Sequence, residues 1–169
     1  MADVSDPIII RPASRADVPV ILQFIRELAR YERLEHEVCA SAAELAEALF
    51  GERRYAEVVF ACSSGLPVGF ALFFHNFSTF RGRPGIYLED LYVRPEARGR
   101  GIGKRLLAHL AHLAVQRRCA RLEWAVLDWN EPSIGFYRSL GAVALDEWTV
   151  FRLTGDALAL LAGSARAQG

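Results

Sequence analysis

The 169-residue sequence lacks an excess of charge of either sign, because its 20 Lys and Arg are balanced by 20 Asp and Glu. Proteins that bind nucleic acids through a broad surface usually carry a basic excess, so the composition argues against that class. Long apolar runs are also missing, and the longest, such as Val68–Phe74, are far too short to span a bilayer. We therefore expect neither a nucleic acid nor a membrane as a partner.

Cysteine is equally scarce. Cys39, Cys62 and Cys119 are odd in number and lie far apart, without a CxxC pair. This pattern favours buried structural thiols in a reducing compartment. The N-terminal stretch Met1–Pro7 is acidic and has no apolar region of the kind found in secretory signals. We expect a soluble, cytoplasmic protein.

Apolar residues, by contrast, are plentiful. They make up 52% of the chain, enough for a substantial core, and we expect residues 1–169 to form a single domain. Their spacing predicts an α/β (mixed α+β) order, with an antiparallel meander first and helices between the later strands. Ser14–Asp17 and Ser41–Glu44 have the spacing of capping boxes that begin helices. The predicted strands cover residues 8–12, 56–62, 67–77, 85–93, 121–126 and 148–153, and the predicted helices cover residues 18–29, 42–49, 106–116, 131–140 and a segment near Leu158.

Three glycines and four arginines follow the strand that ends at Val93, within the stretch Arg94–Leu107. The first turn of a helix leaves backbone N–H groups without partners and carries the positive end of the helix dipole. Glycine permits the backbone angles that aim these groups inward and removes the Cβ that would hold a phosphate away. Arg98, Arg100 and Lys104 add formal charge. The stretch predicts a phosphate or pyrophosphate site, and the alternative is a turn that needs glycine only for tightness.

Two familiar nucleotide motifs do not fit this stretch. A Walker A loop requires a glycine where Arg98 stands and a Ser or Thr where Arg105 stands. A dinucleotide fingerprint requires glycine at position 104 or 106, and these are Lys104 and Leu106. A nucleotide-binding module is therefore disfavoured.

The pattern that remains is R-x-x-G-x-G, formed by Arg98, Gly101 and Gly103. It resembles the acetyl-coenzyme A signature of the GNAT superfamily of N-acetyltransferases. The stretch "NEPSIGFYRSLGA", from Asn130 to Ala142, is similar to the helix that follows the acyl-binding strand in those enzymes. Together with "ELARYE", "YLEDLYV" and "WNEPSIGFY", it resembles the diamine (spermidine/spermine) and thialysine acetyltransferase branch over most of the chain.

This resemblance implies a fold and a cofactor site. The fold would be GNAT-like, with a twisted, mostly antiparallel sheet flanked by helices, whose two central strands splay apart to admit the pantetheine arm. Acetyl-CoA would be the co-substrate. The implied cofactor-binding residues are Leu91, Tyr92, Val93, Arg98, Gly99, Arg100, Gly101, Ile102, Gly103, Lys104, Asn130, Pro132, Ser133 and Tyr137.

Acetyl transfer to an amine poses two proton problems. A lysine-type amine has a pKa of about 10.4, so a base must remove its proton at neutral pH, and the leaving thiolate must then be protonated. Tyr137 lies on one helical face with Asn130 and Ser133, and by resemblance it is the acid beside the sulfur. Its alternative is an aromatic packing beside Phe136. A direct attack by the amine requires no cysteine nucleophile.

Four residues are expected at the acceptor side. Glu89 matches the family position that accepts the amine proton, and Asp90 is adjacent to it in a strand, so the two side chains should point to opposite faces. Both are costly in an apolar strand unless solvated, paired or functional. Tyr31 and Glu32, at the end of the first long helix, match substrate-contacting positions. The alternatives are a charge at a wet strand end for Glu89 and a solvated helix end for the other pair.

The acceptor and the metal content are less closely constrained. His109 and His112 are spaced i, i+3 without a third ligand, so we expect no metal. Arg81 and Arg83, if near the acceptor, would repel a polyamine and pair with an amino-acid carboxylate. We expect a small primary amine, either a diamine or a lysine-like amino acid, and a homodimer by resemblance. A peptide N-acetyltransferase and a non-catalytic coenzyme A sensor remain the alternatives.

Overall fold

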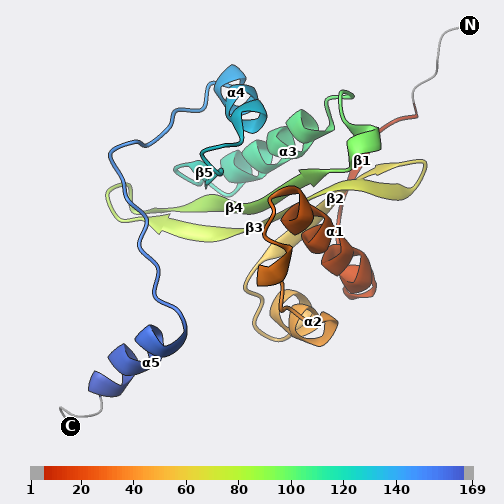
Figure 1. Ribbon diagram of the computed structural model, residues 1–169. Coiled ribbons are helices and arrows are strands. Elements are labelled where there is room, and N and C mark those ends of the chain that lie inside the picture. The colour runs from red at the N-terminus through yellow and green to blue at the C-terminus, as the bar shows by residue number, and fades with distance from the viewer. Residues whose placement is uncertain (1–5, 166–169) are drawn as a thin grey trace, which may run out of the picture. The chain divides into compact units, whose positions relative to one another are not determined.

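The computed structural model describes residues 6–165, which form two compact units that meet in sequence between Leu127 and Asp128 (Figure 1). Residues 6–127 hold the whole sheet of the described chain, and residues 128–165 hold two helices. Whether the whole chain acts as one acetyltransferase domain stays a prediction.

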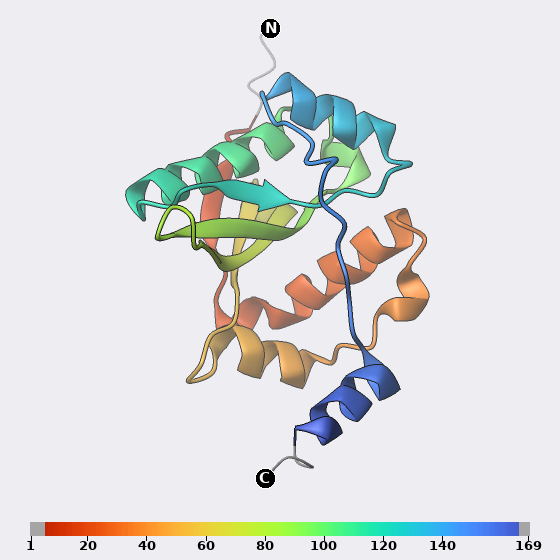
Figure 2. The same ribbon diagram turned by 90° about the vertical axis from the view of Figure 1, so that its left-hand side faces the viewer.

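The sheet of the first unit has five strands in the order β1-β2-β3-β4-β5. The first four pair antiparallel as consecutive neighbours, and β5 pairs parallel with β4. The views in Figures 1 and 2 show that the sheet is twisted, so the expectation of a twisted, mostly antiparallel sheet is confirmed. The strands are β1 (Ile9–Pro12), β2 (Glu57–Ser63), β3 (Leu66–Ser78), β4 (Arg83–Val93) and β5 (Leu122–Trp124).

Helices cover both faces of this sheet. In Figures 1 and 2, α3 lies on one face, and α1 and α2 lie on the other. None of the helices within residues 6–165 is both long and apolar enough to cross a membrane. The helices of this unit are η1 (Arg15–Asp17), α1 (Val18–Tyr31), η2 (Glu35–Glu37), α2 (Ala42–Phe50), η3 (Pro95–Ala97) and α3 (Ile102–Gln116).

The core between α1 and the sheet is built on Phe24. Its ring stacks on Phe70 of β3 with 5.1 Å between centroids and meets Tyr92 of β4 edge-on at 6.2 Å. Ile21 and Leu28 of α1 are buried in the same cluster, as their helical spacing predicted. The sequence pattern did not single out Phe24, although its side chain is fully buried.

The strands β4 and β5 separate partway along their length. Their pairing runs from Ile86 opposite Leu122 to Leu88 opposite Trp124 and ends there. β4 continues to Val93, so along its last five residues no strand of the described chain lies opposite on that edge. The pairing of β4 with β5 is therefore limited to three residues, and beyond it the backbone groups on that edge of β4 have no strand partner within residues 6–165.

The second unit, residues 128–165, holds α4 (Glu131–Ser139) and α5 (Gly155–Ser164). α4 ends as predicted at Gly141, which has a φ of 86° and donates its N–H to the carbonyl of Arg138. The prediction of a strand over residues 148–153 is wrong. A strand needs a neighbour to satisfy its backbone groups, and residues 128–165 contain no other strand to supply one.

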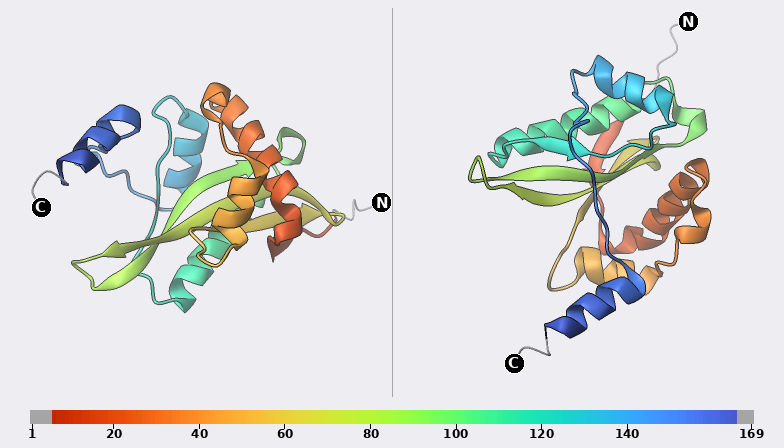
Figure 3. Two further views of the ribbon diagram at one scale, coloured as in Figure 1. Left: turned by 90° about the horizontal axis from the view of Figure 1, so that it is seen from below. Right: turned by 60° about the vertical axis from the view of Figure 1, so that its left-hand side comes forward.

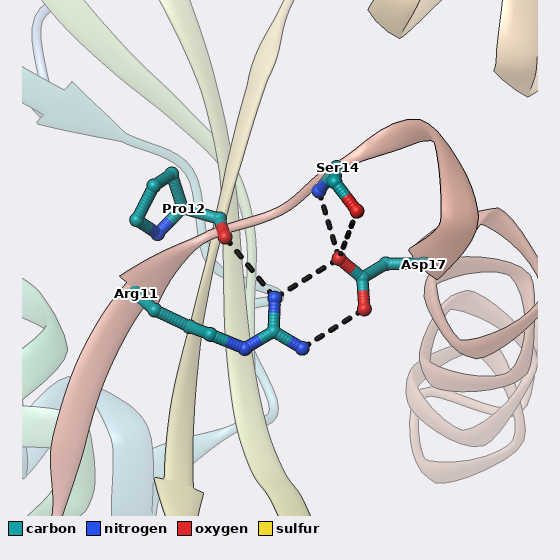
Figure 4. Close-up of polar contacts among 4 residues, drawn as sticks. All are labelled: Arg11, Pro12, Ser14 and Asp17. Carbon is teal, nitrogen blue, oxygen red and sulfur yellow. Dashed lines mark hydrogen bonds and ion pairs between the residues drawn. The ribbon is translucent and has the colours of Figure 1, made fainter.

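An ion pair joins β1 to the start of α1 (Figure 4). Two guanidinium nitrogens of Arg11 each lie 2.9 Å from a carboxylate oxygen of Asp17. The same carboxylate accepts the backbone N–H of Ser14 at 2.7 Å and its hydroxyl at 2.9 Å, which confirms the predicted capping box. The Arg11 hydrogen bond outweighs the opposing effect of burial and holds the pKa of Asp17 well below its usual range.

We predict that Asp17→Asn lowers the free energy of unfolding by about 2 kcal/mol at pH 7, because it removes charge-assisted hydrogen bonds. A carboxylate with a depressed pKa stabilises the fold above the pKa of the unfolded chain, about 3.9, and loses this effect as the pH falls. The difference between the two proteins should therefore shrink below pH 4. Urea denaturation at pH 7 and pH 3 measures it.

The matched control is Glu35→Gln. Glu35 pairs with Arg30 at 2.8 Å, but both side chains are more than half exposed, so solvent screens the pair and its removal should cost much less. Equal losses for the two variants would contradict a special role for Asp17.

Candidate active site

A β-bulge lies at Glu89, where β4 separates from β5. Leu72 of β3 lies opposite Asp90 and Phe73 lies opposite Leu88, so Glu89 has no partner on β3. A bulge re-aims the side chains around it. The expectation that Glu89 and Asp90 point to opposite faces assumed a regular strand, and the bulge removes that premise.

The carboxyl group of Asp90 has a strongly raised pKa. Its side chain is half-buried, and burial, followed by the negative charges of Glu89 and Glu32, raises its pKa to about 7. Burial also raises the pKa of Glu32. The end of α1 and the bulge of β4 thus bring together three of the four predicted acceptor residues in an environment that favours binding a proton or an ammonium group.

The end of α1 is fixed by a left-handed residue. Arg33 has a φ of 62°, and its N–H bonds to the carbonyl of Arg30, while Leu34 bonds back to Ala29 at 2.8 Å. These two bonds form a Schellman motif, in which the left-handed position is normally glycine. The motif ends the helix directly after Tyr31 and Glu32, and so holds both residues at the helix end.

Arg98 connects this helix end to the glycine-rich turn. Its Nε donates to the carbonyl of Val93 at 2.9 Å, and its guanidinium lies 4.9 Å from the ring centre of Tyr31 and 5.5 Å from that of Tyr92. The sequence pattern suggested only a charge for a phosphate at this position. The stacking was not foreseen, because it depends on two rings that are distant in sequence.

The turn before α3 has the backbone expected of an anion cradle. Gly99 and Gly101 have φ values of 78° and 72°, and Gly101 is the N-cap of α3, where it offers no side chain to cap the first turn. Within residues 6–165, and apart from the chain neighbours of each glycine, no atom lies within 4 Å of a Cβ placed on Gly99 or Gly101. The first turn of α3 also has no side chain that caps its N–H groups.

The cationic side chains near this turn differ in their partners. Arg100 donates to the backbone carbonyl of Asp6 at 3.4 Å and to the Ser63 hydroxyl at 3.3 Å, whereas Lys104 is exposed. Tyr92 and Ile102 are buried in the core. Their side chains therefore face the core, and a role for these two residues in binding the cofactor stays a prediction that would involve their backbone groups.

Asn130, Pro132, Ser133 and Tyr137 all belong to the second unit, at the start of α4 and along it. Asn130 is buried, and its side-chain oxygen accepts the N–H of Ser133 at 3.4 Å, which confirms its predicted role as a cap. Tyr137 is half-buried, with its ring centre 5.4 Å from that of Phe136. The predicted packing neighbour is therefore present, and the proton-donating role stays a prediction.

Two arginines predicted to influence the acceptor lie elsewhere. Arg81 is in the hairpin between β3 and β4, and Arg83 begins β4, at the opposite end of that strand from Val93. Glu89 lies six positions further along the strand than Arg83, roughly 20 Å at the usual rise. Figure 3 shows this hairpin extending beyond α1 and α2. Within one chain, these arginines therefore lie at the other end of β4 from Glu89.

The histidine pair on α3 shows no sign of a metal site. Burial, followed by the charges of His112 and Arg117, lowers the pKa of His109 and favours its neutral form. Within residues 6–165, no three His, Cys, Asp or Glu side chains gather as metal ligands do.

Comparison with known proteins identifies the sequence pattern. Residues 22–142 match the family model described as "Acetyltransferase (GNAT) family". A thialysine N-epsilon-acetyltransferase from Bos taurus is 41% identical, with 92% of this chain and 98% of the relative covered. An L-ornithine N5-acetyltransferase from Arabidopsis thaliana is 34% identical, with 88% of this chain and 85% of the relative covered.

A solved structure agrees with these relatives. An integron cassette protein from the mobile metagenome of V. cholerae superposes with a TM-score of 0.78 at 30% identity, covering 92% of this chain and 97% of its own. The resemblance to the thialysine acetyltransferase branch, and the fold that it implied, are confirmed.

The raised pKa of Asp90 generates a testable pH dependence. An acid whose pKa is higher in the fold than in the unfolded chain stabilises the fold at low pH, and this contribution is lost as the pH rises through the folded pKa. The unfolding free energy of the wild type should therefore fall between pH 4.5 and pH 8. We predict that Asp90→Asn makes this fall smaller by an amount on the order of 1–2 kcal/mol, after allowance for solvent screening. Urea denaturation across this range measures it.

Asp146→Asn serves as the control, because Asp146 is an exposed carboxylate in the second unit. It should leave the pH profile unchanged. An Asp90→Asn profile that follows the wild type would show that Asp90 ionises normally.

Proposed function

The chain belongs to the acetyltransferase (GNAT) family and is an acetyl-CoA-dependent N-acetyltransferase, and from this premise we propose that it acetylates the terminal amine of a small, lysine- or ornithine-like molecule. The observation that supports this acceptor is the gathering of Glu32, Glu89 and Asp90 at the splayed end of β4. Three carboxylates favour an ammonium group over a neutral or anionic acceptor.

The relatives support the same class of acceptor. Those compared above are named for thialysine and L-ornithine, and each of these amino acids ends in a primary amine on a short chain. The displacement of Arg81 and Arg83 from Glu89 removes one reason to prefer an amino acid over a diamine. The preference for a lysine-like amino acid therefore rests on the relatives, and simple diamines remain within the proposed class.

The proposed acetyl-CoA site follows the open edge of β4 to the start of α3. Backbone groups of Leu91 and Val93 would pair with the pantetheine arm as a missing strand would, because no strand of the described chain lies opposite them. The left-handed Gly99 and Gly101 would let the pyrophosphate approach the first turn of α3. Arg100 and Lys104 would add positive charge near it.

The proposed chemistry uses separate residues for the two protons. The neutral amine attacks the thioester carbonyl directly, Glu89 accepts the amine proton through water, and Tyr137 donates a proton to the departing thiolate. Asp90, with its pKa of about 7, can receive a proton from Glu89 at neutral pH. The proposed direct attack uses no cysteine nucleophile. Of the three thiols expected to be buried, only Cys62 is buried, whereas Cys119 is half-buried and Cys39 is exposed.

A mass-spectrometric acetylation panel tests the proposal. Purified protein and acetyl-CoA are offered thialysine, lysine, ornithine, diamines, polyamines, aminoglycosides and peptides. Acetylation of the small amines supports the proposal. Acetylation confined to peptides would establish the peptide acetyltransferase instead, and tight coenzyme A binding without turnover would establish a sensor.

We also propose a homodimer that acts in the cytoplasm. Trp148, Val150 and Phe151 are 74%, 85% and 93% exposed, an unusual display for large apolar side chains, and a second copy would cover them. The three free cysteines agree with a reducing compartment.

A prediction for the cofactor site concerns Gly103, in the first turn of α3. Its backbone φ is not left-handed, so alanine fits the helix and should stabilise it by up to about 1 kcal/mol. The added methyl group should weaken coenzyme A binding roughly tenfold, or about 1.4 kcal/mol, because it occupies the path of the phosphate. Calorimetric titration with coenzyme A measures this. Gly163→Ala in α5 is the control and should leave the affinity unchanged.

Tyr137→Phe should lower kcat by about 10²–10⁴ with little change in coenzyme A affinity, because phenylalanine keeps the ring but has no proton to donate. Steady-state kinetics with the best amine of the panel measures this. A wild-type kcat in a folded variant that binds coenzyme A would remove Tyr137 from the mechanism.

Glu89→Gln should behave differently. Its activity should fall most at neutral pH and recover partly as the pH rises, because free amine then becomes available without a base. The ratio of variant to wild-type kcat/KM, followed from pH 7 to pH 9.5, measures this recovery. A constant ratio would show that Glu89 does not act as the base.

The dimer is tested by light scattering across the working concentration range. We expect the mass of two chains for the wild type and a shift toward one chain for Phe151→Ser, because a polar side chain weakens an apolar contact. A single-chain mass for the wild type at every concentration would overturn the dimer.

A further inference from the structure

Two arginines that follow β4 contact one face of α1. Arg94 forms a paired contact with Glu27, with two N···O distances of 3.1 Å, and its guanidinium lies 4.6 Å from the ring centre of Phe24. Arg98, four residues later, lies 4.9 Å from the ring centre of Tyr31. Phe24, Glu27 and Tyr31 are spaced i, i+3 and i+7, so they form one stripe of the helix.

The two contacts differ in how firmly they are held. Arg94 and Glu27 have side chains only 24% and 22% exposed, and Phe24 is fully buried, so this contact is an anchor. Arg98 and Tyr31 are exposed residues, and Tyr31 is the last residue of its helix. A change in the backbone of the turn after Arg98 would therefore shift the side chain of Tyr31 rather than that of Glu27.

Arg98 is also tied to the turn itself. Its Nε holds the carbonyl of Val93, and the residue directly after it is the left-handed Gly99. The side chain occupies the space between Tyr92 and Tyr31, where an arginine can stack with its planar group. An arginine held in this way is poorly placed to be a simple phosphate ligand.

We infer that Arg98 is a positioning residue that couples binding of acetyl-CoA at the glycine-rich turn to the placement of Tyr31 and Glu32 at the end of α1. This inference rests on the proposed function for the identity of the two ligands. Fixing the turn around a pyrophosphate fixes Arg98 between its two rings. The exposed side chain of Tyr31 at the end of α1 is then ordered before the amine arrives, so the amine binds with a smaller loss of conformational entropy.

The coupling is measured by calorimetric titration with coenzyme A, in the absence and presence of saturating amine, starting with thialysine. Coenzyme A carries no acetyl group, so no turnover occurs. For the wild type we expect the amine to tighten coenzyme A binding about fivefold or more, the lower end of typical coupling. Because the effect is reciprocal, coenzyme A should tighten amine binding by the same factor.

Arg98→Lys should bring this factor to about one. Lysine keeps the charge but lacks both the planar group and the Nε–H that holds Val93. Coenzyme A alone should bind this variant within about threefold of its wild-type affinity. Arg117→Lys is the matched control, since Arg117 also lies over a ring, Phe73, and pairs with Glu57, at the far end of α3. It should retain the full coupling.

Variants of Tyr31, the ring that Arg98 contacts, distinguish a loss of coupling from a general loss of structure. Tyr31→Phe keeps the ring and should retain the coupling, whereas Tyr31→Leu should lose it. The double variant Arg98→Lys with Tyr31→Leu should lose no more than either single variant, because all three disrupt one contact.

The possible results divide clearly. The inference would be overturned by a wild type without coupling or by an Arg98→Lys variant that retains it. It would also be overturned by an Arg98→Lys variant that no longer binds coenzyme A, because Arg98 would then be a direct ligand. The first two results leave the proposed function intact if the wild type still acetylates the amine. If the panel finds no amine that is acetylated, the proposed function fails, and the inference fails with it.

Discussion

The organisation of the first unit depends on one constraint, which is that β4 extends beyond the end of its neighbour β5. β5 pairs with it for three residues and ends opposite Leu88, and the last five residues of β4 then have no strand opposite them on that edge. Backbone groups in this position need partners, and an extended ligand can supply them. The bulge at Glu89 lies at the first residue beyond the pairing, so the place where the sheet opens is also the place where its side chains are re-aimed.

The residues of the first unit that are proposed for the site are arranged around this opening. The carboxylates of Glu89 and Asp90 stand at its beginning, and the glycine-rich turn follows its end at Val93. The end of α1 is joined to both, by the charge of Glu32 acting on Asp90 and by the stacking of Tyr31 on Arg98. A strand of ordinary length, paired throughout, would leave no room for a ligand between these groups.

Local patterns in the sequence were sufficient for much of this description. The capping boxes and the glycine-rich turn depend on near neighbours and were recognised from their spacing. The acceptor residues were proposed from resemblance and stay a prediction. The pKa of Asp90, the stacking of Arg98 and the burial of Phe24 depend on residues distant in sequence, so no local pattern signals them. The strand expected at residues 148–153 failed for a related reason, because β-propensity is expressed only when a partner strand is present. The sequence left open whether Arg81 and Arg83 lie near the acceptor, because it does not show how far a long hairpin extends.

The opening of β4 also has a consequence for solubility. A strand edge without a partner is a template on which another chain can add a strand, and this is a common route to aggregation. Natural sheets discourage it with charged side chains and bulges, and both are found here at Glu89 and Asp90. Before acetyl-CoA binds, the charge of Glu89 and the bulge would therefore disfavour pairing with another strand, and the bound cofactor would then cover the edge. An enzyme short of its cofactor would be protected from aggregation by the same bulge and the same glutamate that serve its chemistry.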